Sequence, residues 1–319
     1  MPSFADRIKL KASEIGFSKA GIVKAEPLLD EGAHLNKWLN QGFHGEMAWM
    51  EREPEKRSDP RLLFPDARSV IVVAINYYTT NEHQTDANSG KVSRYAWGDD
   101  YHDVVREKLT ELLSWIKSKD PSADGKICVD TAPMMDKAWA VRAGLGWLGK
   151  HSNVITKEIG SWFFIGSLLL NLELDYDTET VEDHCGTCTA CLDACPTNAI
   201  VEPYVVDSRK CISYVTIELR GDELPANVAD TLDGWIYGCD ICQDVCPWNR
   251  FEQPSSESRF EPRLGETSLD LDAIGEMTHE EYVPRFRRSA IKRTKLTGLK
   301  RNARHLKQTI LATDIEENK

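Results

Sequence analysis

The sequence lacks the segments that would export the chain or hold it in a membrane. Its first residues, MPSFADRIKLKASEIGFSKAG, carry charges throughout and contain no apolar core of the kind that a secretory signal needs. The longest apolar run, WFFIGSLLLNL at 162–172, is too short to span a bilayer. We therefore expect a cytoplasmic protein without membrane association. A monomer is the simplest expectation, because no spare apolar stripe is evident.

Disulfide bonds are also not expected, although the chain has nine cysteines among 319 residues. A reducing compartment keeps thiols free, and a chain of this length builds a core without covalent cross-links. Nine cysteines in such a setting indicate metal ligands. Cys128 is the exception, because it lies in an apolar segment and is expected to be a buried free thiol.

Acidic residues are absent from one stretch of an otherwise acidic chain. The net charge is −12, yet the segment from Arg285 to Lys307 holds ten Lys or Arg and no Asp or Glu. A basic segment on an acidic protein indicates local contact with a polyanion such as nucleic acid. A solvated, cationic helix face is the alternative interpretation, and composition leaves both open.

Apolar periodicity predicts an α/β (α+β) arrangement for residues 1–180. Helices are expected at 3–16, 28–42, 99–119 and 131–146, and strands at 19–25, 69–78, 125–130, 153–156 and 160–172, with 69–78 as a buried central strand. From 181 to 250 the pattern changes to short helices between cysteines, as in a ferredoxin-like domain. The last part, 251–319, is expected to be an irregular linker up to about 280 and then a basic helical tail.

The cysteine spacing predicts two iron–sulfur clusters. The run CGTCTACLDACP at 185–196 has the C-x₂-C-x₂-C-x₃-C-P spacing of a cubane site, in which the fourth cysteine ligates the other cluster. Aligned on its final Cys-Pro, the second run, CDICQDVCP at 239–247, has Ile236 where its first cysteine should be, and Cys211 is the spare. The predicted ligands are Cys185, Cys188, Cys191 and Cys246 for one [4Fe-4S] cluster, and Cys195, Cys211, Cys239 and Cys242 for the other.

Tetrahedral zinc is the rival interpretation of these cysteines, because two C-x₂-C pairs also suit that ion. A run of four closely spaced thiolates is too crowded for one zinc ion, however, and the two runs together with Cys211 supply eight ligands. The count therefore favours iron–sulfur clusters.

Asp130 is the candidate proton donor. It ends the strand expected at 125–130, and open α/β sheets bind ligands at the carboxyl ends of their strands. A partly desolvated carboxyl group there could hold a proton at neutral pH and deliver it to a leaving oxygen. A helix N-cap is the alternative role. Asp136 and Lys137 are expected on a helix surface, and His102 is expected to be structural.

The motifs together resemble the epoxyqueuosine reductase family. The resemblance runs from about residue 5 to residue 305 and rests on the ordered set EREPEKRSDP, SRYAWGDDYHDV, DTAP…DKAWAVRAGLGWLGK, CGTCTACLDACPTNAI, KCISYVTIE and YGCDICQDVCPWN. It implies reduction of epoxyqueuosine to queuosine at the wobble position of tRNA, the last step of queuosine biosynthesis. It also implies cobalamin without a lower axial side chain, beside the two [4Fe-4S] clusters.

The resemblance further implies roles for particular residues. Electrons from an external donor would pass through the clusters to cobalamin, and Asp130 matches the family's proton donor. The residues that match the family's cobalamin contacts are Arg57, Ser93, Asp130, Val154, Ile165, Ser213, Asp240 and Ile241. Lys150 and His151 are further candidates for lining the same pocket.

The basic tail is expected to be a short remnant of the HEAT-like repeats that some family members carry. Its cations would contact tRNA phosphates, which gives affinity and salt dependence rather than base specificity. The expected contacts are Arg287, Arg288, Lys292, Arg293, Lys295, Lys300 and Arg301.

Two other functions remain open at this point. One is a reductive dehalogenase-like corrinoid enzyme that acts on a small molecule; an exported one would be expected to carry a twin-Arg signal, and it would not need the basic tail. The other is a ferredoxin-type electron carrier without enzymatic activity, which would need neither cobalamin nor an acid at Asp130.

Overall fold

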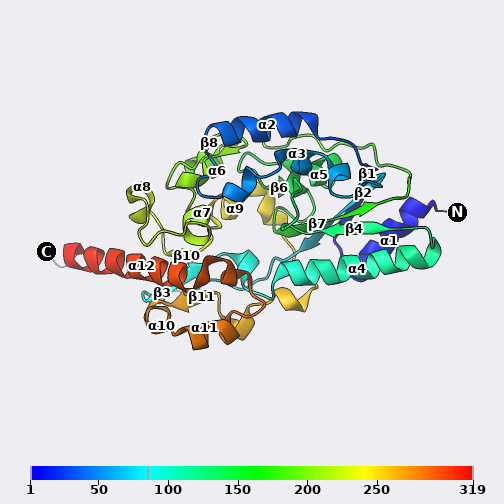
Figure 1. Ribbon diagram of the computed structural model, residues 1–319. Helices are drawn as coiled ribbons and strands as arrows, with labels where there is room; N and C mark the ends of the chain where they lie inside the picture. Colours follow the sequence, from blue (N-terminus) through cyan, green and yellow to red (C-terminus); the bar gives the residue numbers. More distant parts are fainter. Residues whose placement is uncertain (1, 85, 318–319) are drawn as a thin grey trace.

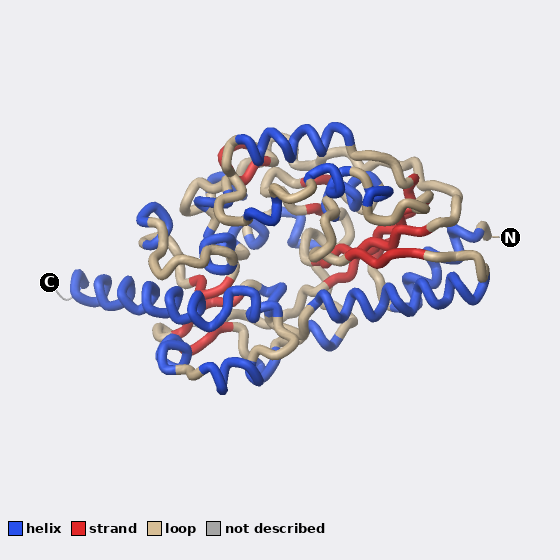
Figure 2. The backbone as a smooth tube through the Cα atoms, in the orientation of Figure 1, coloured by secondary structure: helices blue, strands red, loops and turns tan. Residues whose placement is uncertain are grey.

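A four-stranded antiparallel sheet organises one half of the molecule (Figures 1 and 2). The computed structural model describes residues 2–84 and 86–317. In that part of the chain the strand order is β1 (Lys19–Lys24), β2 (Ser69–Asn76), β7 (Phe163–Leu170), β4 (Gly125–Cys128), and every neighbouring pair is antiparallel. This sheet is therefore antiparallel throughout, which is the α+β form of the expected class.

The two faces of this sheet belong to different helices. Alternate side chains of β2, such as Ile71 and Val73, pack with α1 (Phe4–Ile15) and α4 (Tyr101–Lys119). The intervening side chains, such as Val72, pack on the face of α5 (Asp136–Arg142). Because every position of β2 is buried, its unbroken apolar run correctly predicted an interior strand.

A smaller sheet forms a second core. Its order is β10 (Trp235–Tyr237), β3 (Ser89–Val92), β11 (Ser268–Asp270), and α7 (Ile212–Ile217), α10 (Leu271–Glu276) and α12 (Lys295–Glu317) pack around it. Strand β3 comes from the first 180 residues, so the chain contributes to this sheet from both sides of the predicted boundary.

The C-terminal part is more ordered than its composition indicated. The stretch expected to be irregular contains β11 and α10, and α11 (His279–Arg285) follows. Leu299, Ala303 and Leu306 of α12 are buried in the second core, so the tail is an integral part of that core rather than a free basic helix (Figure 1).

Short elements carry the cysteines between the two sheets, as the sequence predicted (Figure 1). Most of the cysteines lie beside α6 (Ala190–Asp193), α7 and α9 (Ile241–Asp244). The remaining elements are α2 (Leu29–Asn40), α3 (Pro54–Ser58), α8 (Ala226–Ala229), β5 (Trp147–Leu148), β6 (Val154–Ile155), β8 (Ile200–Glu202), β9 (Val205–Val206) and the 3₁₀ turns η1 (Ala48–Met50), η2 (Pro60–Leu62), η3 (Arg94–Ala96), η4 (Ser208–Lys210), η5 (Pro247–Phe251), η6 (Ser258–Phe260), η7 (Arg263–Gly265) and η8 (Ala290–Thr294).

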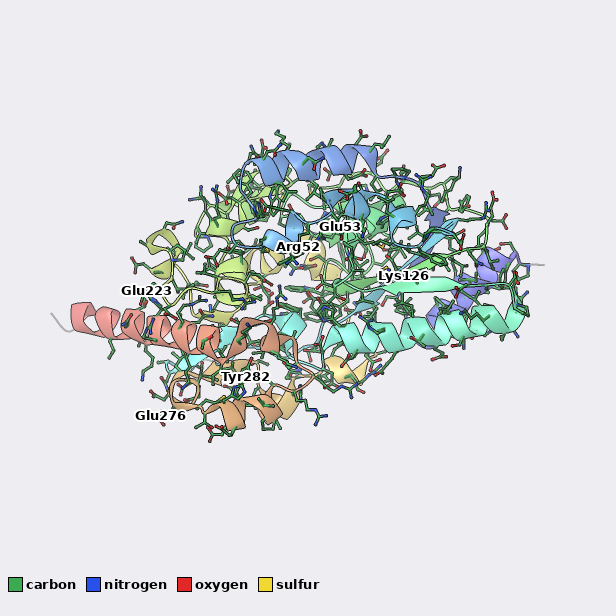
Figure 3. All side chains as sticks on the ribbon, viewed as in Figure 1. Arg52, Glu53, Lys126, Glu223, Glu276 and Tyr282 are labelled. Carbon is green, nitrogen blue, oxygen red and sulfur yellow. The ribbon has the colours of Figure 1, made fainter. Side chains whose placement is uncertain are left out.

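Charged side chains cover the outside of the molecule. Arg52, Lys126 and Glu223 are exposed examples from three different parts of the chain (Figure 3). Among the described helices, none has the length and apolar character needed to cross a bilayer.

Candidate active site and cysteine centres

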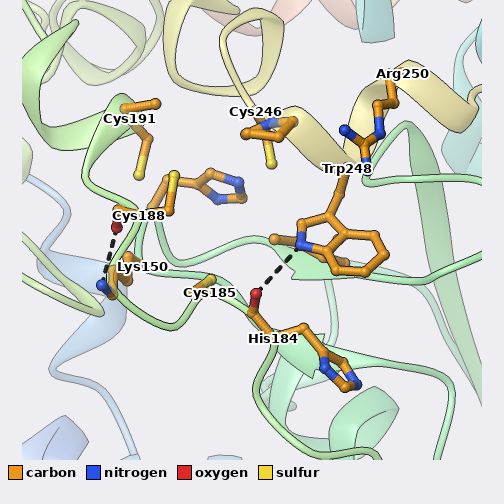
Figure 4. Close-up of a pocket in the computed structure, with 12 residues that line it drawn as sticks. Lys150, His184, Cys185, Cys188, Cys191, Cys246, Trp248 and Arg250 are labelled. Atoms are coloured by element: carbon orange, nitrogen blue, oxygen red, sulfur yellow. Dashed lines mark hydrogen bonds between the residues drawn. The ribbon is translucent and has the colours of Figure 1, made fainter.

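Four cysteines from the two runs line one pocket. Cys185, Cys188, Cys191 and Cys246 surround a cavity of about 200 Å³. Figure 4 shows the sulfur atoms of Cys188, Cys191 and Cys246 turned toward a common space. The structure thus brings together the four cysteines that the count assigned to the first cluster, and their role as ligands stays a prediction.

The hairpin of β5 and β6, together with η5, covers this first set. Trp147 and Trp248 pack edge to face, with ring centroids 5.0 Å apart. The ammonium group of Lys150 donates to the backbone oxygens of Gly186 at 2.6 Å and of Cys188 at 2.9 Å (Figure 4). A lysine in this place fixes the cysteine loop and puts a positive charge beside thiolates.

The second set is gathered from four positions in the chain. Cys195 follows α6, Cys211 is the N-cap residue of α7, and Cys239 and Cys242 flank the start of α9. Burial raises the pKa of the Cys242 thiol, and the charges of neighbours that include Cys211, Cys191 and Cys195 raise it further. Cys191 belongs to the first set, so the two sets are close neighbours.

A single zinc ion and a [4Fe-4S] cluster make different demands on their thiolate ligands. Within the described ranges, no three Cys, His, Asp or Glu side chains lie close enough to hold one metal ion. Zinc draws its thiolate ligands to within about 2.3 Å of one centre. A [4Fe-4S] cluster is a larger body that takes four thiolates around its outside.

Asp130 lies just beyond β4 and forms one end of a chain of three polar groups. His102, in the first turn of α4, lies within hydrogen-bond distance of two carboxyl groups, with Nε2 3.0 Å from Asp130 and Nδ1 2.7 Å from Asp100. Asp100 caps α4 by accepting from the backbone nitrogen of His102. Asp130 has a φ of +49°, in the left-handed region that costs energy for residues other than glycine.

This arrangement sets the protonation of all three groups. Burial acts to lower the pKa of His102, but the hydrogen bonds and charges of Asp100 and Asp130 outweigh it and raise that pKa to about 9. Burial acts to raise the pKa of Asp130, yet His102 and the Tyr101 hydroxyl hold it below its usual value. At neutral pH Asp130 is a carboxylate, so the neutral acid expected from the sequence is wrong for this state of the protein. The proton resides on His102.

The first turn of α5 lies near Asp130. The Oδ1 atom of Asp136 is buried without a hydrogen-bond partner in the described chain, and burial, followed by the charge of Asp130, raises the pKa of Asp136 to about 8. The Lys137 side chain is exposed; the protein around its ammonium group lowers its pKa, while the charges of Cys242 and Asp130 act to raise it. The expected helix surface therefore holds for Lys137 and is wrong for Asp136, which is half-buried.

Arg57 belongs to the same neighbourhood. Its guanidinium is buried, lies over the ring of Trp49 at 5.2 Å and donates to the Trp49 oxygen, while its Nε has no partner. The charge of Asp136 acts on Arg57. We refer to Arg57, Asp130, Asp136 and Lys137 as the Asp130 region.

The other residues matched to cobalamin contacts come from several different elements. Ser93 donates to the buried carboxyl group of Asp240, whose pKa burial raises to about 7. Val154 is buried on β6, whereas Ile165 on β7, Ser213 on α7 and Ile241 on α9 are half-buried. His151 lines the pocket of the first cysteine set.

The tail cations divide into two groups. Arg301 is only 3% exposed and donates to the backbone oxygens of Val215, Leu219 and Gly221, so its predicted contact with tRNA is wrong. Arg288 pairs with Asp103 and Glu107, and Arg293 makes a bidentate pair with Glu218. Among the described residues, no ion-pair partner is found for four of the predicted cations: Arg287, Lys292, Lys295 and Lys300.

Comparison with known proteins places these features in a class. A family model described as "4Fe-4S double cluster binding domain" matches residues 184–249. The α+β fold, the contact between Asp130 and His102, and the match to this cluster-binding domain together define the class of iron–sulfur oxidoreductases. A second model, "Epoxyqueuosine reductase QueG, DUF1730", matches residues 57–131.

The similarity to whole proteins gives the family. The epoxyqueuosine reductase of Cellulophaga algicola is 50% identical over 95% of this chain and 98% of its own length. That of Leadbetterella byssophila is 48% identical over 97% and 100%. A crystal structure of epoxyqueuosine reductase with an epoxyqueuosine-modified tRNA-Tyr stem loop has a TM-score of 0.88 at 31% identity, covering 95% of this chain and 80% of that one. The chain belongs to the epoxyqueuosine reductase family.

Sequence reasoning missed His102 and Asp100 as partners of Asp130. The signal is present in the stretch DDYHD, where a histidine follows a capping aspartate in the first turn of a helix. It is a weak signal, since the other partner lies 28 residues away along the chain.

Proposed function

We propose that this protein reduces epoxyqueuosine in the anticodon loop of tRNA to queuosine, in the cytoplasm. The observation that carries the proposal is the position of Asp130. Its carboxyl group interacts electrostatically with Lys137, and Lys137 interacts in the same way with Cys242 of the second cysteine set. The similarity to curated epoxyqueuosine reductases over nearly the whole chain supports it. A related structure holds the modified tRNA stem loop.

The reaction needs electrons and protons in equal number. Converting an epoxide to an alkene consumes two electrons and two protons, and the oxygen leaves as water. We assign the cysteine sets as ligands of two [4Fe-4S] clusters, which would bring electrons from an external donor. Cys188 in the first set is exposed, whereas Cys242 in the second is half-buried and, like Asp130, acts on the charge of Lys137, so the first set is the proposed point of entry.

Cobalamin fits the polar atoms that the protein leaves without partners. Arg57 Nε, Asp136 Oδ1 and His151 Nε2 are buried and make no hydrogen bond within the described chain. A buried polar atom without a partner costs free energy, so these atoms suit a ligand rich in amide and phosphate groups. Reduced cobalamin would supply the electrons that the epoxide carbon takes up. The residues proposed to hold it are Arg57, Ser93, Asp130, Val154, Ile165, Ser213, Asp240 and Ile241.

Asp130 is the proposed donor of the proton to the leaving oxygen. Its side chain is 62% exposed, whereas its partner His102 is 23% exposed. The carboxyl group therefore presents an accessible oxygen to a substrate while the imidazole lies behind it. A protonated carboxyl group in this place lowers the barrier to expelling an oxygen that would otherwise leave as an alkoxide.

The tRNA backbone is proposed to contact those cations from Arg287 to Lys300 for which the described residues show no ion pair. Arg293 of η8 lies within electrostatic reach of Asp130, which puts this segment on the side of the acid. Lys292 and Lys295 are exposed neighbours of Arg293 along the chain. Arg287 and Lys300 complete the proposed set, and Arg301 is removed from it.

Reconstitution separates the proposed function from its alternatives. The protein is loaded anaerobically with iron, sulfide and cobalamin, reduced, and offered either epoxyqueuosine-containing tRNA or a halogenated phenol. Turnover of the tRNA alone supports the proposal. Turnover of the phenol alone supports a dehalogenase-like enzyme, and cluster reduction with neither turnover supports an electron carrier.

A further inference from the structure

The hydrogen bonds of His102 constrain where the proton of the site resides. A neutral imidazole has one N–H group and an ionised carboxylate has none. His102 lies within hydrogen-bond distance of a carboxylate on each side, Asp100 at 2.7 Å and Asp130 at 3.0 Å. Two such bonds need two hydrogens. Either His102 is an imidazolium between two carboxylates, or it is neutral and Asp130 carries the second proton.

These two states differ by one short proton shift. Breaking the Nε2–H bond of His102 and forming an O–H bond at Asp130 Oδ2 converts the first state into the second. The shift runs from the more sheltered group to the more accessible one, since His102 is 23% and Asp130 62% exposed. The Nδ1–H bond to Asp100 is kept throughout, so the ring stays in place.

The surroundings hold the imidazole in this position. The ring of Tyr101 stacks on His102 at 4.1 Å between centroids and on Phe164 of β7 at 4.3 Å. Asp100 is fixed because it caps α4 and its backbone nitrogen donates to the oxygen of Arg288. The ring is thus held by α4, by β7 and, through Asp100, by the segment between α11 and η8.

The other charged and titratable groups nearby act mainly on Asp130. Lys137 from α5 and Arg293 from η8 are cations that favour its carboxylate form, whereas Asp136 from α5, whose pKa is about 8, opposes that form once it ionises. Three phenols face the site: Tyr95 from η3, Tyr101 from α4 and Tyr237 from β10. Burial raises the pKa of each phenol, so they stay neutral over the working range of pH.

We propose that His102, held by Asp100, stores the proton that Asp130 delivers to the leaving oxygen of the substrate. The epoxide C–O bond breaks as electrons from the reduced cofactor enter. Asp130 first takes the proton of His102 Nε2 and passes it to the ring oxygen, which becomes a hydroxyl group. After the imidazole has been protonated again, the same route delivers a second proton and the oxygen leaves as water, with two electrons consumed in all. A proton from the solvent then restores the imidazolium form of His102. His102 acts through Asp130 and is a positioning residue, and the proposal rests on the proposed function.

The charge of His102 is measurable without turnover. In the cluster-loaded protein with ¹⁵N-labelled histidine, the nitrogen shifts of His102 are followed by NMR between pH 5 and pH 10. We expect an imidazolium up to about pH 9. Asp100→Asn should move that titration down by about one pH unit or more. Asparagine caps a helix as well as aspartate does, so α4 should persist. A wild-type titration near the ordinary value of about 6.5 would overturn the proposal.

The pH profile of a single turnover tests the relay itself. In wild type the rate should be level through neutral pH and fall above about pH 9, where His102 loses its proton. Asp100→Asn should shift this fall to lower pH. His102→Gln should reduce the rate by roughly 10- to 100-fold and remove the alkaline limb, with KM unchanged. His34→Gln, an exposed histidine on α2, is the matched control.

Failure of the relay differs from failure of the function. An unchanged rate and pH profile in both Asp100→Asn and His102→Gln would contradict the relay while wild-type turnover upholds the function. No wild-type turnover would remove the function, and the NMR titration would still decide whether His102 is a charged group held between two carboxylates.

Discussion

At the scale of single residues, position in the fold decides what a polar group does. Asp130 sits on strained backbone and is ionised because an imidazolium lies against it. Arg301 has the same chemistry as the arginines around it, but it is buried and ties α12 to the carbonyl oxygens at the end of α7. Neither role follows from the residue type alone.

Asp130→Asn should remove turnover and leave the rest of the protein intact. Asparagine keeps the size of the side chain and accepts a hydrogen bond, but it cannot carry the transferred proton. A loss of about 10² to 10⁴ in the single-turnover rate is expected. Iron content and tRNA affinity should match wild type. A variant that keeps more than a tenth of the wild-type rate would contradict the assignment of the proton donor.

Arg301→Met should destabilise the protein without a specific effect on tRNA. Methionine keeps much of the apolar stem but leaves the oxygens of Val215, Leu219 and Gly221 without their donor. A loss of about 2–4 kcal/mol in the free energy of unfolding is expected, measured by urea denaturation. Lys300→Met, at the preceding half-buried position, should change stability by less than about 0.5 kcal/mol. Equal stability of the two variants would refute the structural role of Arg301.

At the scale of elements, helix ends and turns organise the site. Cys211 is the N-cap residue of α7, and Cys239 and Cys242 flank the start of α9, so two helix starts gather three thiols of the second set. Turn η8 and helix α12 each have apolar side chains buried in the second core and Lys or Arg side chains exposed to solvent.

Cys211→Ser should remove one cluster and leave the helix in place. Serine is a favourable N-cap residue, so α7 should still form. Reconstituted protein should fall from about eight to about four iron atoms per chain, because one of two cubanes loses a ligand. The matched control is Cys128→Ser, at a buried thiol remote from the cysteine runs in the sequence. Retention of all the iron in Cys211→Ser would disprove the proposed ligand set.

Lys292→Gln and Lys295→Gln should weaken tRNA binding in a salt-dependent way. Each removes an exposed cation for which the described residues show no ion pair. The slope of log Kd against log salt should drop by roughly 0.7–0.9 for each phosphate that the variant no longer neutralises. Arg304→Gln takes the same charge from α12 where it pairs with Glu223, and should leave the slope nearly unchanged. Equal slopes in all three variants would argue against the proposed surface.

At the scale of the whole molecule, local patterns were predictable and long-range pairings were not. The Val- and Ile-rich run of β2 indicated a buried strand, and cysteine spacing alone divided the thiols into the two sets that the structure brings together. The pairing of β3 with β10 and β11 joins segments more than a hundred residues apart, which no local pattern specifies. Arg288 likewise meets an acid 185 positions away.

The same limit explains why the strand directions were not predicted and the protonation of Asp130 was misjudged. The connections here return each strand of the larger sheet antiparallel to its neighbour, and no local pattern specifies this. A carboxyl group near the end of a strand is expected to be a neutral acid when burial acts alone. His102 reverses that expectation, and it reaches Asp130 only through the packing of α4 against the sheet.

Nucleoside analysis after one anaerobic turnover tests the central claim most directly. Protein loaded with both clusters and cobalamin is reduced and mixed with tRNA that carries epoxyqueuosine, and the tRNA is then digested and examined by mass spectrometry. The account predicts a nucleoside lighter by one oxygen atom in wild type and unchanged epoxyqueuosine with Asp130→Asn. Unchanged epoxyqueuosine with fully loaded wild-type protein would contradict it.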